Sequence, residues 1–398
     1  MERESKGDID KLPRAMKELI FGKLSIRSIC SSRIVCKKWN SILSSQSFLF
    51  SLPTQNPWLL ICSQENDGNW HCMAYCFSEQ KWMALPLSFI PNSEGRNITH
   101  LSNMGQGLLL FSEIFTPQLF VCNPLLRSYA KIEIDLNLSQ RFIHIVQGGN
   151  KEPYLIVGSD FEMFSFEIYH YFQDAWRIKY LLETGCNILC RIMVECNGVI
   201  FGMGITPGAI VGYNIKEEGS VSPVTVAPLP GQAVQDLNVH VLYMVSYGSS
   251  VLVVGFLEEP LQQLADGIGP FPRGIHPFIA YNGFAPTRSN MMGIVIWELF
   301  QDEEDKLLWN WKEFARMPPQ LLSQYLNEDW WCQQCVCVGD YLCLSSLYGD
   351  ESASVLAYNL KEGFWQRLPL CKIQCNKRTM MLFEPKLNLY QFLGKLRE

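Results

Sequence analysis

The sequence has no apolar run long enough to span a membrane. Its longest runs are short, as at residues 251–254, whereas a transmembrane helix needs roughly 18 or more apolar residues. Residues 1–6 are mostly charged and lack the apolar segment of a signal peptide, so we expect no secretion. With only 18% charged and 48% hydrophobic residues, the chain can bury a large core and is too apolar for intrinsic disorder. We therefore expect a folded protein of the cytoplasm, the nucleus or both, with no membrane partner.

The sequence also lacks the spaced residues of common catalytic sites. Its six histidines are scattered, and neither a His-Glu-x-x-His motif nor a nucleophile elbow occurs. Cys332 and Cys335 have the spacing of zinc ligands, but Cys335, Cys337 and Cys343 lie in apolar, strand-like surroundings, where cysteine is commonly a small buried hydrophobe. We predict no catalytic residue, no bound metal and no cofactor. Because a fold alone does not exclude catalysis, an enzyme stays open as the alternative.

Disulfide bonds are not expected among the fifteen cysteines. Their number is odd, which disfavours a full disulfide framework. A chain without a secretory signal also folds in a reducing compartment. We expect reduced thiols.

The charge is unevenly distributed along the chain. Residues 1–50 contain ten Lys or Arg and five Asp or Glu, a net charge of +5, whereas the rest contains 23 and 34, a net charge of −11. So large an acidic part disfavours general nucleic-acid binding, which depends on neutralising phosphates. The basic head suits an acidic protein partner.

Residues 9–50 have a helical pattern. Pro13 suits the first turn of a helix, because its missing N–H needs no partner there, and Ser25 is a candidate N-cap for a second helix. Apolar residues recur at helical spacing; they are Met16, Leu19, Ile20 and Leu24, then Ile26 and Ile29, then Val35, Trp39, Ile42 and Leu43. Forty residues form a marginal core alone, so we expect this module to need a partner that covers it.

A linker at residues 51–56 separates the helical segment from residues 57–398, which have a β pattern. Short apolar segments alternate with turn residues. A unit recurs in which an apolar strand and a polar turn lead to an aromatic residue that opens the next strand. The aromatic positions, the first three of them 47 residues apart, are Trp82, Tyr129, Trp176, Trp311 and Trp365. A sixth unit, at residues 212–230, has Leu229-Pro230 in place of the aromatic residue. Six units of this kind are typical of four-stranded blades, so we predict an all-β propeller with six blades.

One connection is much longer than the others. Residues 258–290 are rich in Pro and Gly, and so long a loop in a compact domain is commonly functional. Its aromatic side chains either fold back on the propeller or form a protein-binding patch, because exposing them without a use is costly. A Trp pair further on could fill the core, where propellers commonly use aromatic residues, or bind a partner. The predicted substrate-binding residues are Phe271, Phe278, Tyr281, Phe284, Trp330 and Trp331.

The helical segment resembles the F-box. The residues that carry the resemblance are Leu12-Pro13, Ile20-Phe21, Leu24, Val35-Cys36-Lys37-Lys38-Trp39 and Phe48-Leu49. An F-box followed by degenerate blades is similar to plant F-box/kelch proteins, and residues 314–318, 324–325 and 337–339 look like the subgroup that contains Unusual Floral Organs. The resemblance implies flexible residues 1–8, a small all-α F-box module at residues 9–50, and a kelch-like propeller.

The resemblance also implies a scaffolding function. In this family the F-box packs apolar side chains onto a Skp-family adaptor, which docks on a cullin, while the propeller holds a protein substrate for ubiquitination. Such a subunit is non-catalytic and acts through proximity. The candidate adaptor-facing or module-core residues are Leu12, Pro13, Ile20, Leu24, Ile29, Val35 and Trp39. The alternative is a propeller platform, such as a transcriptional co-regulator, that acts without degrading its target.

Overall fold

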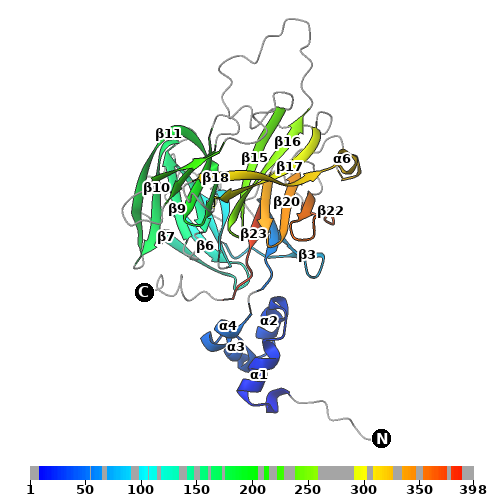
Figure 1. The fold of residues 1–398 in the computed structure, drawn as a ribbon. Helices are drawn as coiled ribbons and strands as arrows, with labels where there is room; N and C mark the ends of the chain where they lie inside the picture. Colours follow the sequence, from blue (N-terminus) through cyan, green and yellow to red (C-terminus); the bar gives the residue numbers. More distant parts are fainter. Residues whose placement is uncertain are drawn as a thin grey trace, which may run out of the picture.

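The computed structural model divides the chain into a small helical module and a mostly β region (Figure 1). This division agrees with the change of pattern in the sequence. The structure describes residues 9–53, 55–64, 70–90, 98–105, 107–113, 118–133, 141–147, 153–159, 163–172, 175–204, 210–214, 222–227, 238–258, 291–302, 308–325, 334–346, 353–373 and 378–387.

Residues 9–51 form the helical module, which lies below the β region in Figure 1. A short 3-10 helix at Ile9–Lys11 opens it. The α-helices that follow are α1 (Arg14–Phe21), α2 (Ile26–Arg33), α3 (Lys37–Leu43) and α4 (Gln46–Ser51). Helix α4 ends one residue inside the predicted linker. The apolar spacing in the sequence does not predict α4 as a separate helix.

Local side-chain chemistry explains where these helices begin. Ser25 caps α2 as predicted, since its Oγ accepts a hydrogen bond from the N–H of Ser28 at 3.3 Å. Cys36 caps α3, where the N–H of Trp39 donates to its Sγ at 3.4 Å. Pro13 lies at the N-cap position of α1 instead of inside the first turn, because its ψ of 151° is extended.

Strands make up most of the remaining described chain. In order they are β1 (Trp58–Gln64), β2 (Trp70–Cys76), β3 (Lys81–Ala84), β4 (Ile98–Gly105), β5 (Leu108–Glu113), β6 (Gln118–Asn123), β7 (Ser128–Glu133), β8 (Arg141–Gln147), β9 (Pro153–Ser159), β10 (Met163–Phe172), β11 (Ala175–Cys196), β12 (Val199–Gly204), β13 (Ile210–Asn214), β14 (Ser222–Val226), β15 (Asn238–Tyr247), β16 (Ser250–Glu258), β17 (Met291–Gln301), β18 (Leu308–Met317), β19 (Gln334–Val338), β20 (Tyr341–Ser346), β21 (Ser354–Asn359), β22 (Phe364–Arg367) and β23 (Arg378–Phe383). A short helix, α6 (Pro319–Tyr325), lies between β18 and β19.

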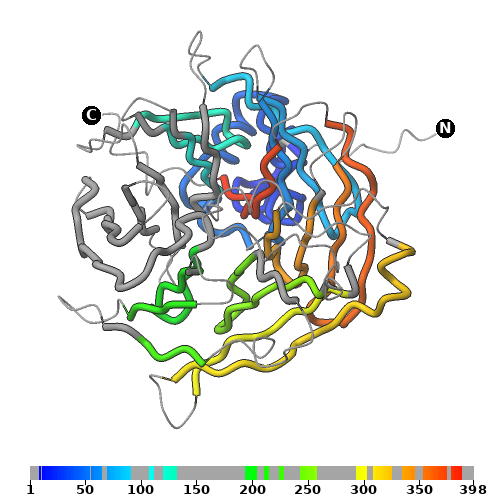
Figure 2. Tube along the Cα trace, turned by 90° about the horizontal axis from the view of Figure 1, so that it is seen from above, coloured from blue at the N-terminus to red at the C-terminus, as the bar shows by residue number. Residues whose placement is uncertain are grey.

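The strands form four sheets that follow one another around the molecule (Figure 2). Three sheets have four strands each, in the orders β23-β1-β2-β3, β4-β5-β6-β7 and β19-β20-β21-β22. The fourth has eleven strands, β15-β16-β17-β18-β14-β13-β12-β11-β10-β9-β8. It is continuous because the long β11 pairs with both β10 and β12, and because β14 pairs in parallel with β18.

The repeat seen in the sequence corresponds to antiparallel hairpins. Each marked aromatic residue lies in a strand that pairs with the strand before it: Trp82 in β3, Tyr129 in β7, Trp176 in β11, Trp311 in β18 and Trp365 in β22. The turns earlier in the units contain Gly198, Gly248 and Gly339 at φ values of 76°, 58° and 59°. Glycine adopts these angles without the strain that a Cβ would cause.

The last described strand closes on the first. β23 pairs antiparallel with β1 from Trp58 opposite Phe383 to Ser63 opposite Arg378. In Figure 2 the red strand accordingly lies beside the blue one. Since β2 pairs with the other side of β1, the first strand has no open edge for another chain to pair with.

Two of the repeated tryptophans connect different hairpins. The indole N–H of Trp82 in β3 donates to the carbonyl oxygen of Pro369, which follows β22, at 2.7 Å. The indole N–H of Trp311 in β18 donates to the carbonyl oxygen of Ala227, which follows β14, also at 2.7 Å. In both pairs the aromatic residue of one hairpin holds the chain that leaves a different hairpin.

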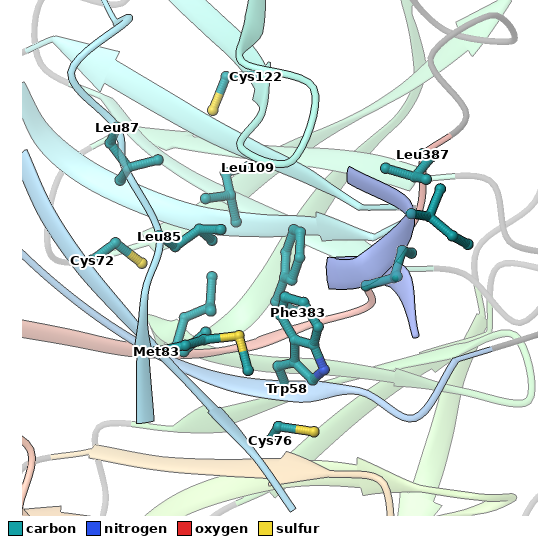
Figure 3. Packing of buried hydrophobic residues seen from close by; sticks show 14 of the residues in the cluster. Trp58, Cys72, Cys76, Met83, Leu85, Leu87, Leu109, Cys122, Phe383 and Leu387 are labelled. Atoms are coloured by element: carbon teal, nitrogen blue, oxygen red, sulfur yellow. The ribbon is translucent and has the colours of Figure 1, made fainter. Parts of the chain in front are cut away.

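One apolar cluster is shared by the helical module and the β region. It contains Phe48 and Leu43 from the helices together with Trp58, Phe383 and Leu387 from the two ends of the β region, along with side chains of the first two four-stranded sheets. Figure 3 shows Trp58 and Phe383 facing each other, with ring centroids 6.0 Å apart, and Leu387 next to a helix of the module. This shared core holds the helical module against the β region.

The segment after β23 strengthens this junction. The side-chain amide of Asn123 at the end of β6 donates to the carbonyl oxygen of Lys386 at 2.8 Å. Gly107, with a φ of 78°, lets the Lys386 backbone approach so closely that an added Cβ would lie 3.0 Å from it. Leu387 is 3% exposed within the shared cluster.

Candidate functional site

Exposed apolar side chains gather on the helical module. Among the described residues nine large hydrophobic side chains are exposed, and six of them belong to residues 9–51. The six are Met16, Leu19 and Ile20 on α1, Ile34 and Val35 between α2 and α3, and Phe50 on α4. We call these six residues the apolar surface of the module. Water-exposed apolar groups in such concentration are typical of protein interaction sites.

The predicted adaptor-facing residues divide between this surface and the interior. Ile20 and Val35 are exposed apolar residues, Pro13 is exposed, Leu12, Leu24 and Trp39 are half-buried, and Ile29 is fully buried. Ile29 therefore belongs to the module core, the alternative that the sequence leaves open, and offers no area to a partner. Trp39 packs edge-to-face on Phe21 with ring centroids 5.0 Å apart, so it contributes to the core and keeps one side at the surface.

Basic side chains accompany the apolar surface. Lys11, Lys23, Arg27, Lys37 and Lys38 are exposed. Arg14 is exposed as well, and its charge is partly compensated by Glu18, whose carboxylate lies 2.8 Å from the Arg14 Nε. These positive charges would speed the association of an acidic partner and would favour one orientation of that partner on the surface.

Comparison with known proteins identifies the helical module. The model of the F-box domain family matches residues 9–51. Residues 9–51 form an F-box domain. The match begins at the 3-10 helix and ends with the last residue of α4.

The chain is also homologous to plant F-box proteins beyond the F-box domain. It is 21% identical over 400 residues to F-box only protein 6 of Arabidopsis thaliana, which covers 95% of this chain and 74% of that protein. It is 27% identical over 140 residues to SKP1-interacting partner 15 of the same plant, which covers 30% of this chain and 37% of that protein. A third F-box protein of Arabidopsis thaliana is 30% identical over 150 residues, 33% of this chain and 36% of its own length.

Four residues of the F-box apolar surface are missing from the predicted site. Met16, Leu19, Ile34 and Phe50 are exposed but do not belong to the motif that identifies the F-box. Helical spacing in α1 places Met16, Leu19 and Ile20 on one face. Spacing alone does not decide whether such a face is buried or exposed, because that depends on where α2 and α3 pack against α1.

The cysteines whose side chains the structure describes are free thiols. Burial and the nearby Asp340 carboxylate raise the pKa of Cys337 to about 12. Burial, with a smaller effect of Cys337, also raises the pKa of Cys343. Both therefore stay protonated at neutral pH, whereas a metal ligand must be a thiolate. Cys332, the first cysteine of the zinc-like pair, lies outside the described part of the chain, and the described part contains no cluster of three or more potential metal ligands.

The predicted substrate-binding residues lie in segments that the structure does not describe. These residues are Phe271, Phe278, Tyr281 and Phe284 in the long connection, and Trp330 and Trp331 before β19. None of the helices in the described ranges is both long and apolar enough to cross a membrane.

Proposed function

We propose that this protein is the substrate-recognition subunit of an SCF-type ubiquitin ligase. The F-box domain docks a Skp-family adaptor and, through it, a cullin, while the β region captures a protein substrate in the cytoplasm, the nucleus or both. The observation that carries the proposal is the apolar surface of the F-box domain, since Leu19, Ile34 and Val35 are more than half exposed. Covering them with a partner removes apolar area from water at about 25 cal/mol per Å². The relative named SKP1-interacting partner 15 supports a Skp-family protein as that partner.

We further infer that the β region is a six-bladed kelch-like propeller, as in the Unusual Floral Organs subgroup of plant F-box/kelch proteins. If the 22-residue β11 is counted in two groups, the eleven-stranded sheet divides into three groups of four strands, β8–β11, β11–β14 and β15–β18, and the other three sheets already have four strands each. The pairing of β23 with β1 and the two tryptophan hydrogen bonds between hairpins support a closed ring. Ring closure buries the faces that an isolated four-stranded blade would expose.

The proposed subunit is non-catalytic and works through geometry. The shared cluster of Phe48, Trp58, Phe383 and Leu387 joins the F-box domain to the β region without a long free linker. A substrate on the β region is thereby held at a set distance and orientation from whatever the F-box domain binds. Converting a bimolecular encounter into a reaction between fixed partners raises the effective concentration of the substrate.

Replacing both Leu12 and Pro13 with alanine tests the proposed adaptor. We expect the tagged double variant to co-purify less Skp-family adaptor than the wild type, by about tenfold, because apolar area at the start of α1 is lost. Circular dichroism melting should show an unchanged β region. The proposal is wrong if the wild-type chain captures neither adaptor nor cullin, or if the double variant captures as much of both as the wild type.

We propose that residues 258–290 take part in substrate capture, with Trp330 and Trp331 as neighbours. Aromatic residues in a Pro- and Gly-rich loop suit a protein-binding patch. Replacing residues 262–288 with a short Gly/Ser linker should leave the melting temperature and adaptor binding nearly unchanged and should reduce proximity labelling of substrates sharply. Unfolding of the shortened chain would show that the loop belongs to the core, and undiminished labelling would place substrate binding elsewhere.

A further inference from the structure

Two cysteines lie directly opposite each other in the first hairpin. In the antiparallel pair of β1 and β2, Cys62 is the partner of Cys72, and both are free thiols. The Sγ of Cys62 donates a hydrogen bond to the Sγ of Cys72, and the two sulfur atoms are 2.8 Å apart. None of the other strand pairs that the structure describes places one cysteine opposite another. This thiol contact is therefore particular to the first hairpin.

The backbone of this pair has the spacing that a disulfide requires. The N–H of Leu85, which follows β3, donates to the carbonyl oxygen of Cys72 at 2.8 Å. The N–H and the carbonyl of one strand residue point to the same neighbouring strand, so the backbone polar groups of Cys72 face β3, and Cys62 and Cys72 form a non-hydrogen-bonded pair. The Cα atoms of such a pair are about 4.5 Å apart. Disulfides span Cα separations of about 4.4–6.8 Å.

The two sulfur atoms also need to move little to form a bond. A disulfide has an S–S length of about 2.05 Å, so closure shortens the present separation by less than about 1 Å. Cys62 is 0% exposed and Cys72 is 4% exposed, and both belong to the shared apolar cluster. Close packing in such a core keeps the two side chains in contact.

A third thiol competes less well for either sulfur. Cys122 of β6 belongs to the same cluster, and the pKa of its thiol is raised mainly by burial, with a smaller effect of Cys72. Cys122 therefore lies near Cys72, but it approaches from another sheet. The register of a single hairpin holds Cys62 and Cys72 together, whereas a bond to Cys122 would require two sheets to shift.

Burial limits how an oxidant reaches the pair. Burial raises the pKa of Cys72, and Cys62 raises it further, so Cys72 is a thiol at neutral pH while the hairpin is closed. The pair lies two positions from the end of the β1–β2 ladder, where Gln64 is opposite Trp70. Ends of strands open more readily than the core does. Opening of this end exposes the sulfurs, and closing returns them to contact.

We propose that Cys62 and Cys72 are a redox-sensitive modification site, at which a peroxide forms a reversible disulfide that locks β1 to β2. The sulfur of Cys72, the more exposed of the two, attacks one peroxide oxygen and breaks the O–O bond, which gives a sulfenic acid and a first water. The sulfur of Cys62 then displaces the hydroxyl group, which forms the S–S bond and a second water. The two thiols together lose two electrons and two protons, which the peroxide takes up.

The close backbone spacing makes the bond easy to reverse. A disulfide at the short limit of the Cα range is strained, and strained disulfides are readily reduced. A dithiol reductant restores both thiols and itself becomes a cyclic disulfide. This modification goes beyond the proposed ligase function and does not depend on an adaptor or a substrate.

Peptide mapping of the full chain tests the bond. The reduced protein is treated with hydrogen peroxide, its remaining thiols are blocked with N-ethylmaleimide, and it is digested with trypsin and a glutamate-specific protease. Peptide 39–65 then contains Cys62 as its only cysteine, and peptide 66–79 contains Cys72 and Cys76. We expect mass spectrometry to find these peptides joined through Cys72, and dithiothreitol to separate them. Amide hydrogen exchange of β1 and β2 should become at least about tenfold slower in the oxidised protein, because the cross-link opposes opening.

Cys343→Ala is the matched control for Cys72→Ala. Cys343 is also a fully buried strand cysteine, but it lies opposite Val336. Cys343→Ala should form the same linked peptides as the wild type, and Cys72→Ala should form none. Mapping of the wild type needs no variant, so it stays decisive if Cys72→Ala fails to fold.

Three results would contradict the inference. The proposal is overturned if the peroxide-treated wild type contains no bond between Cys62 and Cys72, or if this bond forms only in denaturant. A bond from either cysteine to Cys122 would overturn the assignment of the pair. Unchanged hydrogen exchange in the linked protein would overturn the lock on the hairpin.

Discussion

Replacing Leu19 and Val35 with aspartate is expected to abolish adaptor binding. Leu19 on α1 is 65% exposed and Val35 before α3 is 62% exposed. If the adaptor covers both, each contributes about 1.5–3 kcal/mol of apolar burial. The loss of both contributions is at least about 3 kcal/mol, and the dissociation constant should therefore rise more than about 100-fold. Burying two unpaired carboxylates at the interface adds to this loss.

The same double variant is expected to stay folded. Neither side chain belongs to the core, so thermal unfolding followed by circular dichroism should change by no more than a few degrees. Phe364→Asp is the matched control, because Phe364 is 41% exposed but lies on β22, far from the F-box domain in sequence. Its adaptor affinity, measured by biolayer interferometry, should equal that of the wild type. If the double variant binds the adaptor as tightly as the wild type does, the adaptor binds somewhere other than this surface.

Removing β23 is expected to prevent folding of the β region. A chain that stops after residue 377 lacks one of the two strands that pair with β1 and leaves Leu59, Leu60 and Ile61 without their partners on β23. It also lacks the buried Met380, Met381, Phe383 and Leu387. At about 1.5–3 kcal/mol for each large side chain, this loss is comparable to the whole stability of a typical domain, about 5–15 kcal/mol. Differential scanning calorimetry should show no cooperative transition.

A longer truncation separates closure of the sheets from attachment of the F-box domain. A chain that stops after Phe383 keeps β23 but loses Leu387 and the Lys386 carbonyl that Asn123 holds. We expect this chain to fold, to melt at a lower temperature, and to be cleaved faster by protease at residues 52–57.

Lys386→Ala is the control for the longer truncation. It keeps the backbone carbonyl and removes only the side chain, whose ion pair with Glu384 at 3.6 Å is a surface pair worth about 0–1 kcal/mol. Its melting temperature and its rate of cleavage by protease should match those of the wild type.

If the chain ending at 377 unfolds as cooperatively as the wild type, β23 does not close the β region.

The helical module and the hairpins of the β region follow from the sequence because their signals are local. Ser25 caps a helix through a hydrogen bond to a residue three positions away, and Gly248 permits a turn through its own backbone angle. The aromatic repeat likewise marks pairs of consecutive strands, and the F-box motif spans only forty residues. Each of these features depends on residues that are close together in the sequence, so each can be predicted from the sequence alone.

What the tertiary structure alone decides is how distant segments meet. Ile29 and Val35 are both apolar and six residues apart, yet Ile29 on α2 is buried and Val35, between α2 and α3, is exposed, because the packing of the helices determines which side chains are covered. Ser63 and Arg378 are separated by more than 300 residues, and nothing in their surroundings in the sequence pairs them. They meet because β23 returns to β1, which places the two residues directly opposite each other.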